Sequence, residues 1–219
     1  MDDKTSTTGF SCRLCGSERA HTPHVAREMM FGSRESFDYF QCNGCGCLQI
    51  AEIPPDLSRY YPSNYYSHSA QDDIRRRSWL RRVLETRRAY TALFGRGYRL
   101  SRLIKPFVPL PHEIHKIPGE VVHRAGLKDF GAAILDVGSG SSAVWLRHME
   151  LLGFKNLTAV DPFADCDRKL GAVRVLRKEV SALQGQYDLI RLSHSLEHIP
   201  DQHRTFADLR RLLAPGGTI

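Results

Sequence analysis

AAILDVGSG, residues 132–140, is the stretch that decides the fold. Its apolar residues run into Asp136 and a glycine-rich turn, which is typical of a buried parallel strand that ends at a ligand. Gly138 and Gly140 let the backbone turn tightly and approach that ligand, and the amides that open the next helix offer it donors. A second apolar run, LTAV, ends at Asp161, about 21 residues beyond Gly140. In a βαβ unit this spacing places a carboxylate on ribose hydroxyls, so the sequence predicts a ribose-bearing cofactor.

Two kinds of cofactor fit this glycine spacing. Gly138 and Gly140, followed by Ala143, also satisfy the dinucleotide fingerprint, so the glycines alone leave the cofactor open. Asp136 lies two residues before the first glycine, where it would add negative charge beside a dinucleotide pyrophosphate. The position of this acid therefore favours a cationic cofactor.

Four motifs together make the chain resemble the class I S-adenosylmethionine-dependent methyltransferases. They are LDVGSGSS (135–142), VDP (160–162), YDLIRLSHSLEHIPD (187–201) and LLAPGG (212–217). The resemblance covers about Pro118 to the C-terminus and implies S-adenosylmethionine as the cofactor. The residues that it assigns to cofactor binding are Asp136, Gly138, Ser139, Gly140, Asp161 and Ser193. Ser142 stands where many members of this family have a third glycine.

The alternation of strands and helices after about Pro118 predicts an α/β fold, a Rossmann-like parallel sheet with flanking helices. The expected elements are helices over 120–130 and 142–152, a strand that runs into Asp136 and the glycine-rich turn, strands ending at 161, 176 and 193, and a helix capped by Asp201. A complete domain of the family would add about three strands after Ile219. We therefore expect an incomplete sheet in a C-terminally truncated chain, with an unpaired strand edge that favours self-association.

The end of the strand 187–193 carries the remaining candidates for chemistry. Ser193, His194, Glu197 and His198 follow it, where ligands bind to open parallel sheets. A histidine can take a proton from an attacking hydroxyl near neutral pH, and His194 is the first candidate for this base. His198 with Glu197 resembles the Glu-His pair of the family motif, and it can act as the base or orient the loop.

Composition restricts the class of protein. Apolar residues make up 42% of the 219 residues and charged residues 25%, as in soluble globular proteins. No apolar run approaches the roughly 18 residues of a membrane span, and the polar N-terminus does not resemble a signal peptide. We therefore expect a cytoplasmic location. Six cysteines in that compartment indicate metal binding rather than disulfides.

Two C-x-x-C pairs, separated by 26 residues, predict a metal site. Cys12, Cys15, Cys42 and Cys45 can complete a tetrahedral zinc site, which in a closed four-cysteine arrangement is structural. Cys47 can replace Cys45 or pack as a small apolar residue, and four ordinary thiols are the alternative to a metal. The intervening FDYFQC and CLQIAEI predict the hairpin of a zinc ribbon. The arrangement resembles a zinc-binding module found before some methyltransferases of sugars and secondary metabolites, although zinc ribbons also bind nucleic acid.

A tyrosine-rich stretch, SRYYPSNYYSHS, follows this module. Its phenols can pack against a short irregular connection. In the family that the chain resembles, an aromatic segment at this point lies near the cofactor, which implies Tyr65 or Tyr66 as a lid over the methionine end.

The positive charge of the chain lies in one segment. Residues 71–105 contain ten arginines and one lysine against three acids, or +8, whereas the whole chain carries +7. Trp79, Val83, Tyr90 and Phe94 predict one apolar face of a helix there. The helix can dock on the catalytic domain with solvated arginines, or it can bind an anionic membrane or a phosphate-bearing partner. Nucleic acid is a less favoured partner because only the charge supports it.

The sequence thus predicts a zinc-binding module (1–68), a basic helical linker (69–117) and a partial class I methyltransferase domain (118–219). The leading interpretation is methyl transfer to an oxygen or carbon of a small-molecule substrate, such as a sugar or a glycan or secondary-metabolite precursor. The alternatives are an RNA methyltransferase with a zinc module and a catalytically inactive binding module. Against RNA, the motif Asn/Asp-Pro-Pro-aromatic, common in enzymes that methylate base nitrogens, is replaced by SHSLEH. The sequence does not define the oligomeric state.

Overall fold

The structure is a computed structural model that describes residues 9–30, 32–60, 78–95, 97, 103–111, 114 and 117–219. The chain forms two compact units, the first from residues 1–59 with 199–204 and the second from residues 60–198 with 205–219. None of the helices in the described ranges combines the length and apolar character needed to cross a bilayer.

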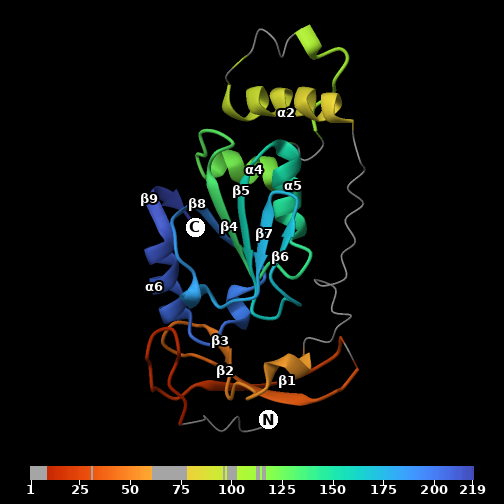
Figure 1. Cartoon of the computed structure of the whole chain (residues 1–219). Helices are drawn as coiled ribbons and strands as arrows, with labels where there is room; N and C mark the ends of the chain where they lie inside the picture. The colour runs from red at the N-terminus through yellow and green to blue at the C-terminus, as the bar shows by residue number, and fades with distance from the viewer. Residues whose placement is uncertain are drawn as a thin grey trace. The chain divides into compact units, whose positions relative to one another are not determined.

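The first unit contains a three-stranded antiparallel sheet (Figure 1). Its strands, in the order β1-β2-β3, are β1 (Thr22–Arg27), β2 (Ser36–Gln41) and β3 (Leu48–Ile50). Phe40 of β2 is buried and stacks on His21 and Phe10, with ring centroids 4.7 and 5.6 Å apart. The pairing of β2 with β3 confirms the predicted hairpin. The second cysteine pair lies in the connection between these two strands.

The second unit is built on a six-stranded sheet of order β6-β7-β5-β4-β8-β9 (Figure 1). Its strands are β4 (Ala133–Val137), β5 (Asn156–Val160), β6 (Arg168–Leu170), β7 (Val173–Leu176), β8 (Tyr187–Leu192) and β9 (Leu213–Thr218). The strands from β7 to β9 are parallel, and β6 pairs antiparallel with β7. The predicted α/β fold with a mainly parallel sheet is confirmed, and β6 is an additional strand that the sequence did not predict.

The strand order reverses between β4 and β8. The chain leaves β4 through α5 (Val144–Leu152) to β5 on one side, and leaves β8 through α6 (Gln202–Leu212) to β9 on the other. Because parallel crossovers are right-handed, crossovers in opposite directions cover opposite faces of the sheet. Ligands bind doubly wound sheets at the carboxyl ends of the strands beside such a reversal. The strand order therefore predicts a ligand-binding site after β4 and β8.

The helices pack apolar side chains against the sheet. Leu146, Met149 and Leu152 of α5 are fully buried, as their predicted spacing requires. The remaining helices are α2 (Trp79–Phe94), α4 (Ile117–Arg124) and the short 3-10 helices Leu57–Tyr60, Val180–Ala182 and Leu196–His198. Phe130 makes edge contacts with Phe94 and Phe154, at 5.3 and 5.0 Å between ring centroids. These rings attach α2 to the core of the second unit.

Two helix boundaries differ from the predictions. Helix α4 begins at Ile117 rather than residue 120, because Pro118 fits the first turn, where its missing N–H costs nothing. It ends at Arg124 rather than residue 130, and Gly126 then adopts the left-handed conformation with φ 64°. Helix α5 begins at Val144 rather than residue 142, because Ala143 is itself left-handed, with φ 45°.

The prediction that the strand 187–193 has an unpaired edge is wrong. Residues 213–218 form β9, which pairs with β8 at Tyr187↔Leu213 and Leu189↔Thr218. Between these two pairs the chain advances by five residues in β9 but by only two in β8. A bulge in β9, which contains the Pro-Gly-Gly sequence, accommodates the extra residues. The pairing satisfies backbone groups of β8 that would otherwise form an open edge.

Candidate cofactor site and metal centre

The carboxyl end of β4 meets that of β8 at very close range. Gly138 has φ 72°, and a Cβ built on it would lie 2.3 Å from the Cβ of Ser195. The Ser195 hydroxyl, buried in this contact, donates a hydrogen bond to the Val137 carbonyl at 2.8 Å. Only glycine fits residue 138, and the neighbour that requires it is Ser195. The close approach of a cofactor to Gly138 stays a prediction.

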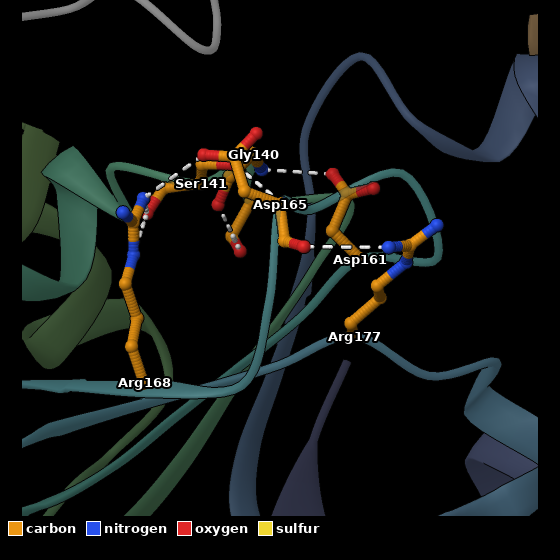
Figure 2. A network of polar contacts seen from close by, with 7 residues as sticks. Gly140, Ser141, Asp161, Asp165, Arg168 and Arg177 are labelled. Carbon is orange, nitrogen blue, oxygen red and sulfur yellow. Dashed lines mark hydrogen bonds and ion pairs between the residues drawn. The ribbon is translucent and has the colours of Figure 1, made fainter.

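Asp161 bonds directly to the glycine loop, as Figure 2 shows. Its Oδ2 accepts the Gly140 amide at 2.8 Å, and its Oδ1 accepts the Phe163 amide at 2.8 Å. The side chain is buried, with 9% of the residue exposed. The carboxylate that is expected to bind the ribose therefore lies beside the glycine loop. Each of its oxygens has a second lone pair, and a ribose diol would donate its hydrogen bonds to these.

A network of hydrogen bonds holds the loop after β5 against the glycine loop (Figure 2). The Asp165 amide donates to the Ser141 hydroxyl at 3.1 Å. The Arg168 guanidinium donates to the Ser141 carbonyl through both Nε, at 3.1 Å, and Nη2. Arg177 donates from Nη1 to the Asp165 carbonyl at 3.3 Å. These bonds hold the loop after β5 against the glycine loop and against Arg177, which follows β7.

Asp136 does not present a free negative charge to a cofactor. It is buried, and its Oδ1 accepts a hydrogen bond from Arg191 Nη1 at 2.9 Å. Burial raises the pKa of Asp136 to about 6, against the opposing attraction of Arg191. The Arg191 guanidinium lies 4.6 Å from the centroid of the Trp145 ring, a cation–π contact. Arg191 thus already balances the charge from which the sequence argued for a cationic cofactor, and the role of Asp136 in cofactor binding stays a prediction.

The turn after β8 brings its candidate groups to the surface. His194 has φ 52°, and its Nδ1 lies 3.8 Å from Glu197 Oε1. The side chains of His194 and Glu197 are 87% and 55% exposed. Ser193 is half-buried and His198 exposed, and the His198 amide donates to the Ser195 carbonyl at 3.1 Å. The catalytic roles of these residues stay predictions.

Three residues important for this geometry were not among the sequence predictions. Arg191 interrupts the apolar run of β8, and a charge within such a run is a signal that it has a partner. Ser195 and Arg168 gave no such signal, because their roles depend on contacts between separate strands.

Ser139 is half-buried, and its hydroxyl donates to the Gly140 carbonyl at 3.1 Å. The predicted lid residues, Tyr65 and Tyr66, lie outside the described residues.

The four predicted metal ligands cluster in the first unit. The Sγ atoms of Cys12, Cys15, Cys42 and Cys45 all lie within 4.8 Å of one another, with Cys12–Cys45 at 3.7 Å and Cys15–Cys42 at 3.6 Å. A tetrahedral zinc with Zn–S bonds of about 2.3 Å requires sulfurs about 3.8 Å apart. The cluster therefore fits zinc. Cys47 is outside it, and its thiol points to the Leu48 carbonyl at 3.7 Å.

Backbone turns of the same form present each cysteine pair. The Gly16 amide donates to the Cys12 carbonyl at 2.8 Å, and the Gly46 amide donates to the Cys42 carbonyl at 2.7 Å. Both glycines are left-handed, with φ 68° and 76°. This local repetition explains why the two sequence pairs converge on one point.

The four thiols differ in their tendency to ionise. Burial opposes ionisation of Cys12, but the Cys15 and Leu14 amides and Gln49 outweigh it and lower the pKa to about 6. Gln49, which is buried, donates from Nε2 to Cys12 Sγ at 3.0 Å. For Cys45 the Cys47 amide favours the thiolate, but burial and the neighbouring thiols raise the pKa to about 12. A divalent cation would compensate the mutual repulsion of four thiolates and displace their protons.

A family described as "Methyltransferase domain" matches residues 110–219 of the chain. This match covers half of the 219 residues and includes the glycine loop, Asp161 and the turn after β8. No curated protein matches the chain. The chain belongs to this methyltransferase family, which agrees with the doubly wound sheet.

Proposed function

We propose that the protein is an S-adenosylmethionine-dependent methyltransferase that acts on an oxygen or carbon of a small molecule, such as a sugar or a precursor of a glycan or secondary metabolite. The observation that carries the proposal is the glycine loop at the sheet reversal, with Asp161 bonded to the Gly140 amide. The family of the chain supports the reaction type.

The start of α5 supports S-adenosylmethionine over a dinucleotide. In dinucleotide sites the pyrophosphate binds the N-terminus of the helix that follows the glycine loop directly. Here α5 begins at Val144, four residues after Gly140, and the left-handed Ala143 precedes it. A cofactor without a pyrophosphate has no need of that helix end.

The chain's own residues divide the work of the proposed reaction. Gly138, Ser139 and Gly140 would bind the cofactor through their backbone, and Asp161 would accept hydrogen bonds from the ribose. The bound cofactor supplies a methyl group on a sulfonium, which an acceptor takes by in-line displacement. His194 or His198, at the carboxyl end of β8, would take the proton of a hydroxyl acceptor. Ser193 would bind the cofactor from the same strand end.

The zinc ion would have a structural role. Four cysteine ligands leave no open coordination position for a substrate. The ion would hold the two cysteine turns and the sheet of the first unit together, since a unit of this size has a small core. Its resemblance to modules that precede methyltransferases of sugars supports the proposed class of acceptor.

Calorimetric titration tests the cofactor. We expect the zinc-loaded chain to bind S-adenosylhomocysteine and S-adenosylmethionine saturably and to ignore NAD⁺ and NADH. Asp161→Ala should weaken this binding by tenfold or more, whereas Asp208→Asn, on α6, should not. Binding of a nicotinamide dinucleotide alone would reverse the assignment.

Transfer of a labelled methyl group tests the acceptor. The chain is incubated with methyl-labelled S-adenosylmethionine, nucleotide sugars and RNA. RNA is separated from small molecules by size, and ion-exchange chromatography then separates the anionic nucleotide sugars from the cationic, unreacted S-adenosylmethionine. Label in the nucleotide-sugar fraction supports the proposal, and label in RNA supports the RNA methyltransferase instead. Saturable cofactor binding without any transfer, across a broad set of acceptors, supports the inactive binding module.

A further inference from the structure

The first turns of α2 project large apolar side chains into solvent. Trp79, Leu80 and Val83 are 77%, 59% and 47% exposed. The buried residues of α2 begin only at Glu85, and the helix is attached through Arg88, Leu93 and its aromatic contacts. The predicted apolar face is therefore divided: its C-terminal half packs in the core, and its N-terminal half does not.

Positive charge surrounds these exposed apolar residues. Arg81, Arg82 and Arg87 are all exposed. The only acid of α2, Glu85, is buried and pairs with Arg81 at 3.0 Å. The sequence adds three more arginines at 75–77, directly before the helix, within the segment that carries +8. No acidic side chain of α2 therefore opposes an anionic surface.

We propose that the N-terminal half of α2 is a docking surface for an anionic lipid bilayer. An interfacial helix buries tryptophan and aliphatic side chains at the boundary between headgroups and acyl chains, and its arginines contact lipid phosphates. Trp79, Leu80 and Val83 lie within a roughly 100° arc of the helix, the width of such an apolar stripe. This inference is independent of the methyltransferase reaction.

The apolar residues decide between a bilayer and nucleic acid. Arginines alone would suit either polyanion. A nucleic acid can stack a base on Trp79, but it leaves Leu80 and Val83 in water. A bilayer buries all three, so it accounts for both the charge and the apolar exposure.

Vesicle binding by the full chain tests the proposal. Vesicles of phosphatidylcholine are compared with vesicles in which about a third of the lipid is phosphatidylglycerol, at low and high salt. We expect sedimentation with the anionic vesicles, reduced by salt, and little with the neutral ones. Absence of binding to anionic vesicles at low salt would overturn the proposal.

Matched double variants separate the apolar contribution to vesicle binding from the electrostatic one. Trp79→Ser/Val83→Ser and Arg82→Gln/Arg87→Gln should each weaken binding at least tenfold. Arg204→Gln/Arg210→Gln, which removes two arginines from α6, should change it less than twofold. All of these positions are exposed, so equal thermal midpoints are expected and show that each variant is folded.

The environment of Trp79 provides a readout that charge alone would not change. The chain has two tryptophans, so subtraction of the Trp79→Phe spectrum isolates the emission of Trp79. We expect a blue shift with anionic vesicles and quenching by brominated acyl chains. Tighter binding to RNA than to vesicles, unaffected by Trp79→Ser/Val83→Ser, would overturn the proposal in favour of nucleic acid.

Discussion

Gly138 and Ser195 fix the distance between the ends of β4 and β8. The side chain of Ser195 occupies the space where a Cβ of residue 138 would lie, and its hydroxyl caps the Val137 carbonyl. The glycine loop and the turn that carries His194 and His198 are thereby held next to each other. The two groups of candidate residues lie at neighbouring strand ends because one glycine permits this contact.

Gly138→Ala should destabilise the second unit and abolish binding of S-adenosylhomocysteine. The left-handed backbone costs about 1–2 kcal/mol for a residue with a Cβ, and overpacking against Ser195 adds about 1–3 kcal/mol. Gly216→Ala is the matched control, with φ 78° and nothing within 4 Å of its added Cβ. Urea denaturation should show a clear excess loss for residue 138, and equal losses for both variants would contradict the steric account.

Arg168 is expected to position the glycine loop through the Ser141 carbonyl. Arg168→Gln removes both of its hydrogen bonds, so it should weaken binding of S-adenosylhomocysteine about tenfold, while Arg168→Lys should restore part of this loss. Arg174→Gln, which removes one bond to Thr158 on β5, is the control. If calorimetry gives equal affinities for the Arg168→Gln and Arg174→Gln chains, Arg168 has no positioning role.

The raised pKa of Asp136 predicts a specific pH dependence of stability. The carboxyl has a pKa of about 6 in the folded chain against an ordinary value of 3.8, so between these values the folded state binds more protons than the unfolded state. Its contribution to stability therefore increases as the pH falls through about 6. From pH 7.5 to 5, wild type should gain on the order of 1 kcal/mol relative to Asp136→Asn in urea denaturation. A difference that is constant with pH would contradict the shift.

At the scale of elements, the two cysteine turns act as one metal site. Cys45→Ser should lose most of the bound zinc, because it removes one of four ligands, whereas Cys47→Ser should keep about one zinc per chain. Because protons compete with the metal for the thiolates, the affinity should fall with decreasing pH. Metal analysis of the purified variants checks this assignment. Loss of zinc from the Cys47 variant alone would exchange the roles of Cys45 and Cys47.

Local patterns predicted most of the elements. The periodicity of Leu146, Met149 and Leu152 located α5, and the apolar runs before Gly138 and Asp161 located β4 and β5. Strands β6 and β9 were not predicted, because RKL and LAPGGT have little strand character of their own. They form because neighbouring strands offer unpaired backbone groups. The predicted self-association was based on an open edge of β8, and β9 occupies that edge.

The candidate site was predictable where spacing along the chain determines it. The cysteine pairs and the pair formed by Gly140 and Asp161 follow from spacing alone, and both converge as expected. The partner of Asp136 was not predictable, since Arg191 is its neighbour only through the register of β4 with β8. The same holds for the contact of Arg168 with Ser141. Contacts across the sheet depend on register, which a single sequence does not provide.

At the scale of the whole molecule, each unit has its own source of stability. The first unit relies on the cysteine cluster and a small core around Phe40, and the second on the buried faces of its sheet. Removal of zinc by a chelator should therefore expose the amides of β1–β3 to hydrogen exchange and leave those of β4 and β5 protected. Loss of protection throughout both units would show that the metal stabilises the whole chain.

The central claim is that the glycine loop and Asp161 form the binding site for S-adenosylmethionine. Its most direct test is an NMR titration of the ¹⁵N-labelled, zinc-loaded chain with S-adenosylhomocysteine. We predict saturable shifts of the Gly138, Gly140 and Phe163 amide signals, while those of Gly16 and Gly46 in the cysteine turns stay unchanged. Absence of any shift at saturating ligand, or shifts of the loop signals with NAD⁺ but not with S-adenosylhomocysteine, would contradict the account.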